Sequence, residues 1–187
     1  MVIKYNKQTY NEDSPWIFFT DGIKSNKNNL VWNRNDVSVL NRGFVCAYPI
    51  LRGTNYLDSN WLNQGIEERK LTHFMDLIDS AIFIKEKGLT KKIGVFGQGQ
   101  SGSVTALTSI FKEPYLFECC VAHNPITDLI NHLMYDIEDM KKMNSSESEY
   151  TNHHFEKLKE YGDPKNKIFF DSHKFISPYH QRIIDES

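Results

Sequence analysis

Short apolar runs of strand length alternate along the chain with stretches in which apolar residues recur every three or four positions. Continuous apolar runs are typical of strands buried on both faces of a parallel sheet. Apolar residues at helical spacing indicate amphipathic helices that cover such a sheet. The alternation of the two patterns predicts an α/β fold with a mostly parallel sheet. The predicted strands are Trp16–Thr20, Phe44–Tyr48, Lys92–Phe96 and Cys119–His123, and the predicted helices are Asp36–Asn41, Glu67–Lys87 and Ser101–Phe111.

The pattern changes toward both ends of the chain. Residues 1–14 are polar and are expected to form a loose lead-in, so the folded domain is expected over residues 15–187. Residues 126–187 are expected to be helical or irregular, with no further strand. A parallel sheet that lacks its later strands exposes an edge and an apolar face, so we expect poor solubility or self-association.

Composition narrows the possible partners and the compartment. The 187 residues carry a formal net charge of −2 and no basic patch, so nucleic acid is not expected as a partner. The sequence contains no run of about 18 apolar residues, so we expect no membrane span. Three cysteines, two of them adjacent, are too few for a disulfide framework, which favours a reducing, cytoplasmic setting. The seven histidines show no metal-ligand spacing, and we expect neither metal nor cofactor.

A glycine-rich turn joins the third predicted strand to the helix that follows it. Its glycines, Gly97, Gly99 and Gly102, match the G-x-G-x-x-G pattern of a dinucleotide-binding loop. That interpretation requires an acidic residue at the end of the next strand, to bind the ribose hydroxyls. The next strand ends His123-Asn124-Pro125 and offers no carboxylate there. Dinucleotide binding is therefore one alternative, with one of its requirements unmet.

The same turn also matches the nucleophile elbow of α/β-hydrolases. An elbow needs small residues on both sides of its tip, because bulky ones would collide with the adjoining strand and helix. Gly97, Ser101 and Gly102 meet this requirement around a tip at Gly99. A glycine at the tip carries no nucleophile.

The elbow is one of several stretches that follow one another in a recognisable order along the chain: Arg42–Gly53, Trp61, Gly65, Lys70–Asp76, Glu86–Lys92, the elbow, Tyr161–Pro164 and Ser177–His180. In this order they resemble landmarks of the prolyl oligopeptidase family of serine peptidases, and of its oligopeptidase B branch most closely. The resemblance implies an α/β-hydrolase domain, normally joined to a β-propeller, that cleaves short peptides through an acyl-enzyme. Short peptides are therefore the implied ligands.

The departures from that family concern its catalytic groups. Gly99 stands where the family has its serine, and Asp21 stands where the family has an oxyanion-binding tyrosine. The second oxyanion donor would be the backbone N–H of Gln100. The family's triad Asp and His lie beyond the Ser-Pro-Tyr motif, and this sequence ends seven residues after His180. We therefore expect a fragment or degenerate copy that does not hydrolyse peptides.

Two candidate residues have more than one interpretation. Ser101 is a substitute nucleophile or, as its place in the first turn of a helix favours, a capping or packing residue. Arg52 follows the end of a strand, where it either lines the site or serves as a structural ion-pair partner. A further alternative for the whole chain is a hydrolase scaffold retained to bind a peptide or a protein partner without cleaving it.

Overall fold

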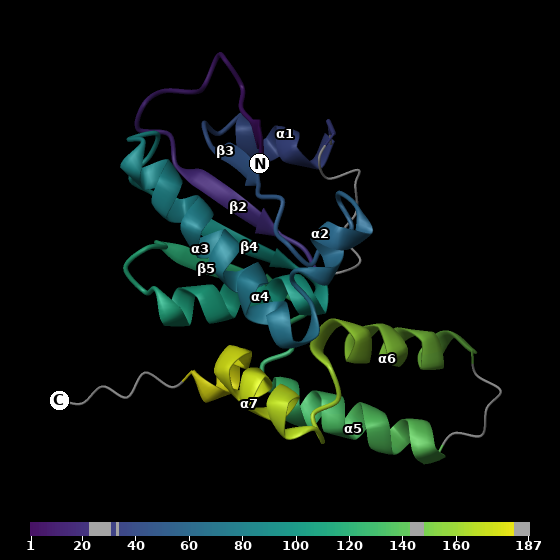
Figure 1. Cartoon of the computed structure of the whole chain (residues 1–187). Helices are drawn as coiled ribbons and strands as arrows, with labels where there is room; N and C mark the ends of the chain where they lie inside the picture. Colours follow the sequence, from purple (N-terminus) through teal and green to yellow (C-terminus); the bar gives the residue numbers. More distant parts are fainter. Residues whose placement is uncertain (23–30, 33, 143–147, 182–187) are drawn as a thin grey trace.

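The computed structural model describes residues 1–22, 31–32, 34–142 and 148–181 and shows an α/β arrangement around one sheet (Figure 1). The sheet has five strands in the order β1-β3-β2-β4-β5. All neighbours pair in parallel except β1 and β3, which are antiparallel. The strands are β1 (Val2–Lys4), β2 (Trp16–Thr20), β3 (Val45–Tyr48), β4 (Ile93–Gln98) and β5 (Cys119–His123). The predicted α/β class with a mostly parallel sheet is confirmed.

The expected loose lead-in over residues 1–14 is wrong at its start, because Val2–Lys4 forms β1. This strand pairs with β3, with Ile3 opposite Ala47. Val2 packs against the buried cluster of Leu40, Cys46 and Tyr48. A strand of three residues is too short to show a periodic apolar pattern in the sequence. It forms because it pairs with β3.

Helices cover the two faces of the sheet unequally. Both α3 (Lys70–Glu86) and α4 (Gly99–Lys112) contribute to the main core cluster on one face, with Leu77 and Ala106 among their buried residues. On the opposite face, the short α1 (Val37–Leu40) packs beside β3. Burial on both faces, which the apolar runs predicted for all four strands, therefore occurs only in β3. Burial alternates along β2 and β4, and β5 is half-exposed.

Short helical turns complete this part of the chain. The 3-10 helix η2 (Arg34–Asp36) precedes α1, and α2 (Ser59–Asn63) and η3 (Glu67–Arg69) precede α3. The predicted long helix over Glu67–Lys87 is thus η3 followed by α3.

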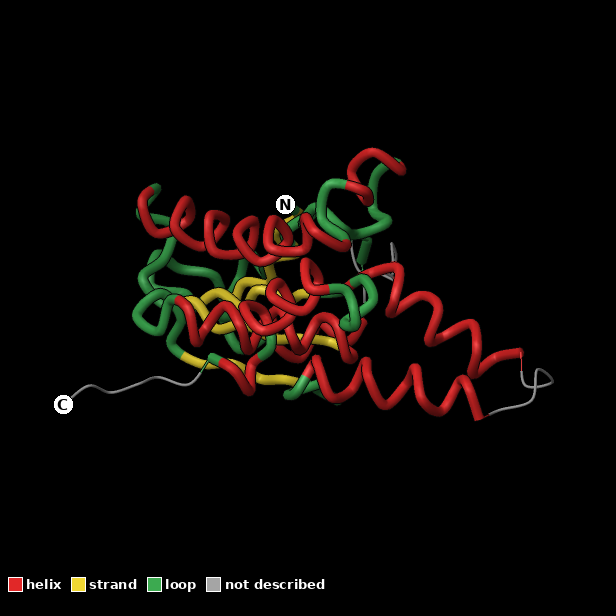
Figure 2. Tube along the Cα trace, turned by 60° about the horizontal axis from the view of Figure 1, so that its bottom comes forward, coloured by secondary structure: helices red, strands yellow, loops and turns green. Residues whose placement is uncertain are grey.

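The described residues after β5 are helical and contain no strand. They form α5 (Leu129–Lys142), α6 (Ser148–Tyr161), α7 (Lys167–Ile176) and the 3-10 turn η4 (Pro178–His180). Figure 2 shows α5 and α6 extending side by side away from the sheet. Seven residues form a second buried cluster between these helices, α3 and α4: Phe74, Val104, Ile126, Leu129, Leu133, Tyr161 and Ile176. This cluster attaches the helical part to the face that α3 and α4 occupy.

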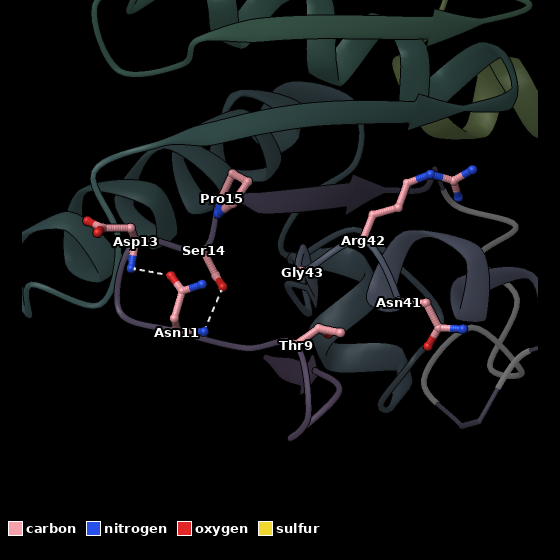
Figure 3. Close-up of a pocket in the computed structure, with 8 residues that line it drawn as sticks. All are labelled: Thr9, Asn11, Asp13, Ser14, Pro15, Asn41, Arg42 and Gly43. Carbon is pink, nitrogen blue, oxygen red and sulfur yellow. Dashed lines mark hydrogen bonds between the residues drawn. The ribbon is translucent and has the colours of Figure 1, made fainter.

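A shallow polar pocket of about 500 Å³ lies where β2 and β3 begin (Figure 3). Its polar groups bond to one another: the N–H of Asn11 donates to Ser14 Oγ over 3.0 Å, and the N–H of Asp13 donates to Asn11 Oδ1 over 2.9 Å. The glycine-rich turn follows the opposite end of β4, so this pocket is separate from the elbow site. Its lining residues are Thr9, Asn11, Asp13, Ser14, Pro15, Asn41, Arg42 and Gly43.

Candidate active site

The glycine-rich turn has the strand–turn–helix form that both interpretations of the sequence require. Strand β4 ends at Gln98 and α4 begins at Gly99. Gly99 has φ +67°, in the left-handed region that non-glycine residues rarely adopt. A Cβ built on Gly99 would have no atom within 4 Å. The tip therefore has the left-handed backbone and the open surroundings of an elbow tip, but it carries no reactive side chain.

The other two glycines of the turn are required by close packing. A Cβ on Gly97 would lie 2.5 Å from the carbonyl oxygen of Gly102, and one on Gly102 would lie 2.3 Å from the carbonyl oxygen of Thr20. The first turn of α4 therefore lies directly on β4 and on the end of β2. This packing, together with the positive φ of Gly99, accounts for the three glycines of the G-x-G-x-x-G match without a bound phosphate. Gln100 lies in the same first turn, where helix amides have no intrahelical partner.

Ser101 has a hydrogen-bond partner that no local pattern in the sequence predicts. Its hydroxyl donates to Glu160 Oε2 over 2.7 Å, which ties α4 to the end of α6. The position before α4 is Gln98, whose side chain makes no capping bond. The predicted capping role of Ser101 is therefore not what its hydroxyl does in the structure.

A buried ion pair lies next to this serine. Lys70 Nζ donates to Glu160 Oε1, and the two residues are 0% and 1% exposed. Burial and the neighbouring Lys70 charge together hold the pKa of His73 well below its usual value. Burial first, and then the charge of Glu160, raises the pKa of Tyr161 well above its usual value. Both His73 and Tyr161 are therefore neutral at ordinary pH.

Asp21 ends up beside the elbow and pairs with a tyrosine from another loop. The hydroxyl of Tyr56 donates to Asp21 Oδ2. The next residue, Gly22, lies so close to the elbow that a Cβ on it would be 2.1 Å from Ser101 Cβ. A phenol thus lies beside the position at which the family has its oxyanion-binding tyrosine, but it comes from Tyr56. Only the folding of the loop after β3 reveals this contact.

Arg52 is a structural ion-pair partner. Its Nε lies 2.9 Å and 3.1 Å from the two carboxylate oxygens of Asp76, and its backbone N–H donates to the same carboxylate over 2.8 Å. The carbonyl oxygen of Arg52 lies 2.6 Å from Nδ1 of His73, which must donate because a carbonyl only accepts. These contacts fix the loop after β3 to α3. Within the part of the chain that the structure describes, no cluster of potential metal ligands forms.

A family model and several known proteins match this chain. The model of the prolyl oligopeptidase family matches residues 32–177. The chain belongs to the prolyl oligopeptidase family. A peptidase of Sinorhizobium fredii, itself uncharacterised, is 26% identical over 146 residues, and the prolyl endopeptidase-like protein of Gallus gallus is 24% identical over 120 residues.

Solved structures of prolyl oligopeptidase family members share the fold. Oligopeptidase B from Leishmania major has a TM-score of 0.76 at 19% identity, over 96% of this chain and 23% of that one. Prolyl oligopeptidase B from Galerina marginata has a TM-score of 0.77 at 21% identity, over 96% of this chain and 24% of that one. The α/β-hydrolase type of the sheet, which the sequence resemblance implied, is thereby confirmed.

This family member spans only a small part of its relatives. It matches with 77% of its own length and 18% of the Sinorhizobium protein, and with 61% of its length and 16% of the Gallus protein. No helix among the described residues has the length and apolar character that crossing a membrane requires.

Proposed function

We propose that this chain is a peptidase-type α/β-hydrolase segment that binds short peptides and does not hydrolyse them through its elbow. The observation that carries the proposal is Gly99 at the tip, with the left-handed φ of an elbow and no side chain to attack a carbonyl. Covalent peptide hydrolysis of the serine type begins with a hydroxyl at that position. Membership of the prolyl oligopeptidase family supports peptides as the ligand class.

The surroundings of Ser101 argue against its replacing the missing nucleophile. A serine nucleophile is activated by a base that accepts its proton and is itself oriented by a third group. Ser101 does donate to a carboxylate, but Glu160 is only 1% exposed and its other oxygen accepts from the buried ammonium of Lys70, so the carboxylate is the partner of a buried ion pair. The serine hydroxyl therefore belongs to a structural network.

The carboxylate of Asp21 also supports the proposal. Acyl transfer requires hydrogen-bond donors aimed at the negative charge that develops on the carbonyl oxygen. A carboxylate at the end of β2, beside the elbow, repels such a charge. The hydroxyl of Tyr56 is a donor at this place, but it already donates to Asp21.

A reducing, cytoplasmic setting is part of the same proposal. All three cysteines are free thiols in the structure, with Cys46 buried, Cys119 exposed and Cys120 between the two. Burial raises the pKa of Cys46 to about 12, so this thiol is unreactive.

Labelling and turnover test the proposal directly. The purified chain is incubated with a fluorophosphonate probe and with peptides that carry basic or prolyl cleavage sites, and an active prolyl oligopeptidase serves as positive control. We expect no labelling and no cleavage, together with saturable binding of a fluorescent peptide measured by anisotropy. Labelling that disappears in Ser101→Ala would contradict the inactive elbow. Failure to bind any peptide would contradict the ligand class.

A further inference from the structure

We propose that Ser101, Glu160 and Lys70 form a latch that holds the C-terminal helices against the elbow. The inference concerns the conformation of the elbow and does not depend on peptide binding. The three residues come from the first turn of α4, the last turn of α6 and the start of α3. The latch therefore joins parts of the chain that lie 59 and 90 residues apart.

The carboxylate of Glu160 is the centre of the latch. One oxygen accepts the hydroxyl of Ser101 over 2.7 Å, and the other accepts the ammonium of Lys70. Aromatic rings surround the ammonium: Nζ lies 5.0 Å from the ring centroid of Tyr161 and 6.0 Å from that of Phe74. Both oxygens of a buried carboxylate thus have donors from other elements.

Because Glu160 and Lys70 are buried, their contact is either intact or fully broken, with no stable arrangement between the two. A charge that loses its partner while still buried is strongly unfavourable, because neither water nor another charge replaces the contact. Glu160 can leave Lys70 only if the end of α6 moves far enough for water to reach both groups. The latch is therefore either closed or released together with the helix that carries it.

The serine links this movement to the elbow. Ser101 lies two residues after the tip Gly99, and its Cβ fills the space beside Gly22. A Cβ on Gly22 would also lie 3.4 Å from Glu160 Oε1, so the end of β2, the elbow and α6 meet at one point. Release of Glu160 therefore loosens the first turn of α4 as well as the last turn of α6.

Hydrogen exchange measured by mass spectrometry on the full chain tests the latch. Ser101→Ala removes the hydroxyl and keeps the Cβ that packs beside Gly22. The matched control is Ser109→Ala on the same helix, because Ser109 is fully buried and its hydroxyl has no hydrogen-bond partner in the structure. We expect Ser101→Ala to speed exchange on the order of tenfold over residues 99–105 and 155–162, from the loss of one hydrogen bond to a charged group. Exchange over β1 and α1 should not change.

A second variant removes the charges. Lys70→Met with Glu160→Leu replaces the ion pair by apolar groups of similar size and leaves no unpaired charge. We expect the same two segments to exchange faster in this double variant, although its core remains packed. Exchange in Ser101→Ala that stays within twofold of Ser109→Ala would overturn the latch. So would acceleration spread evenly over the whole chain, because that indicates general loss of stability.

Discussion

Glycine is favoured in the turn for two different physical reasons, close packing and a positive φ, and substitutions distinguish between them. Only glycine fits at positions 97 and 102, because backbone atoms of neighbouring segments lie where a Cβ would be. Gly99 has open space around it, and only its positive φ favours glycine there. The same is true of Gly88, which follows α3 with φ +66° and no atom within 4 Å of a built Cβ.

Gly99→Ala should therefore lower the free energy of unfolding by about 1 kcal/mol, the cost of a side chain in the left-handed region. Gly88→Ala is the matched control and should cost the same. Gly97→Ala should cost several kcal/mol more, because strand β4 and helix α4 must separate. Urea denaturation measures all three. Equal losses for Gly97→Ala and Gly99→Ala would refute the distinction.

The buried histidine makes stability depend on pH. Because the pKa of His73 is lowered in the folded chain, the unfolded chain binds a proton more readily below its own pKa of about 6.5. Stability is therefore complete above that pH and should fall as the pH drops from about 7 to 5. Burial lowers the pKa of His173 as well, so that residue contributes in the same direction.

Replacing His73 by Gln should flatten this pH dependence, whatever it does to stability at pH 7.5. The measurement is the urea midpoint at pH 7.5 and at pH 5.5. His123→Gln, at an exposed position, is the control and should leave the pH dependence of the urea midpoint as it is in the parent chain. An unchanged slope in His73→Gln would assign the pH dependence to other groups.

At the scale of elements, the strands and long helices follow from local pattern, and their attachments follow from distant polar pairs. The four apolar runs predicted four strands, and all four are present with bounds that differ by at most two residues at either end. The pairs that join the elements, Arg52 with Asp76 and Lys70 with Glu160, have no signature in the sequence. Each combines residues whose separation, 24 and 90 positions, exceeds any local spacing rule.

The Arg52–Asp76 pair should matter more than an ordinary surface ion pair. Asp76 accepts both the guanidinium and the backbone N–H of Arg52, so Asp76→Asn should cost about 1–3 kcal/mol. Asp79→Asn changes an exposed carboxylate on the same helix and should cost less than about 0.5 kcal/mol. Thermal unfolding of the two variants provides the comparison. A cost for Asp76→Asn no greater than for Asp79→Asn would show that the pair does not hold the loop.

At the scale of the whole molecule, the edge of the described sheet at β5 is the surface through which we expect self-association. Strand β5 is the last strand in the described sheet, and Val121 on it is 53% exposed. The N–H of Glu118 donates to the carbonyl oxygen of Ile93 on β4, so by strand alternation the backbone groups of residues 119 and 121 point away from β4. No Lys or Pro, the residues that commonly protect an edge, occurs on this strand.

We therefore expect the chain to self-associate with rising concentration, through pairing of this edge. Val121→Lys should weaken the association by at least tenfold, because a charge on the edge opposes a second strand. Val121→Thr keeps the branched shape and should leave association nearly unchanged. Sedimentation velocity over a concentration series measures both. A monomer at every concentration, in the parent chain and both variants, would contradict the expectation.

The sequence by itself determined the α/β class, four of the five strands in the described sheet, the elbow form of the turn and the absence of a nucleophile at its tip. These features depend on residues close together in the chain: apolar periodicity and glycine spacing. Tertiary structure alone decided that β1 joins the sheet, that β3 is the one strand buried on both faces, and that Tyr56 meets Asp21. It also decided that Ser101 bonds to Glu160 rather than capping its own helix. The physical reason is the same in each case, because a contact between distant residues exists only once the chain has folded.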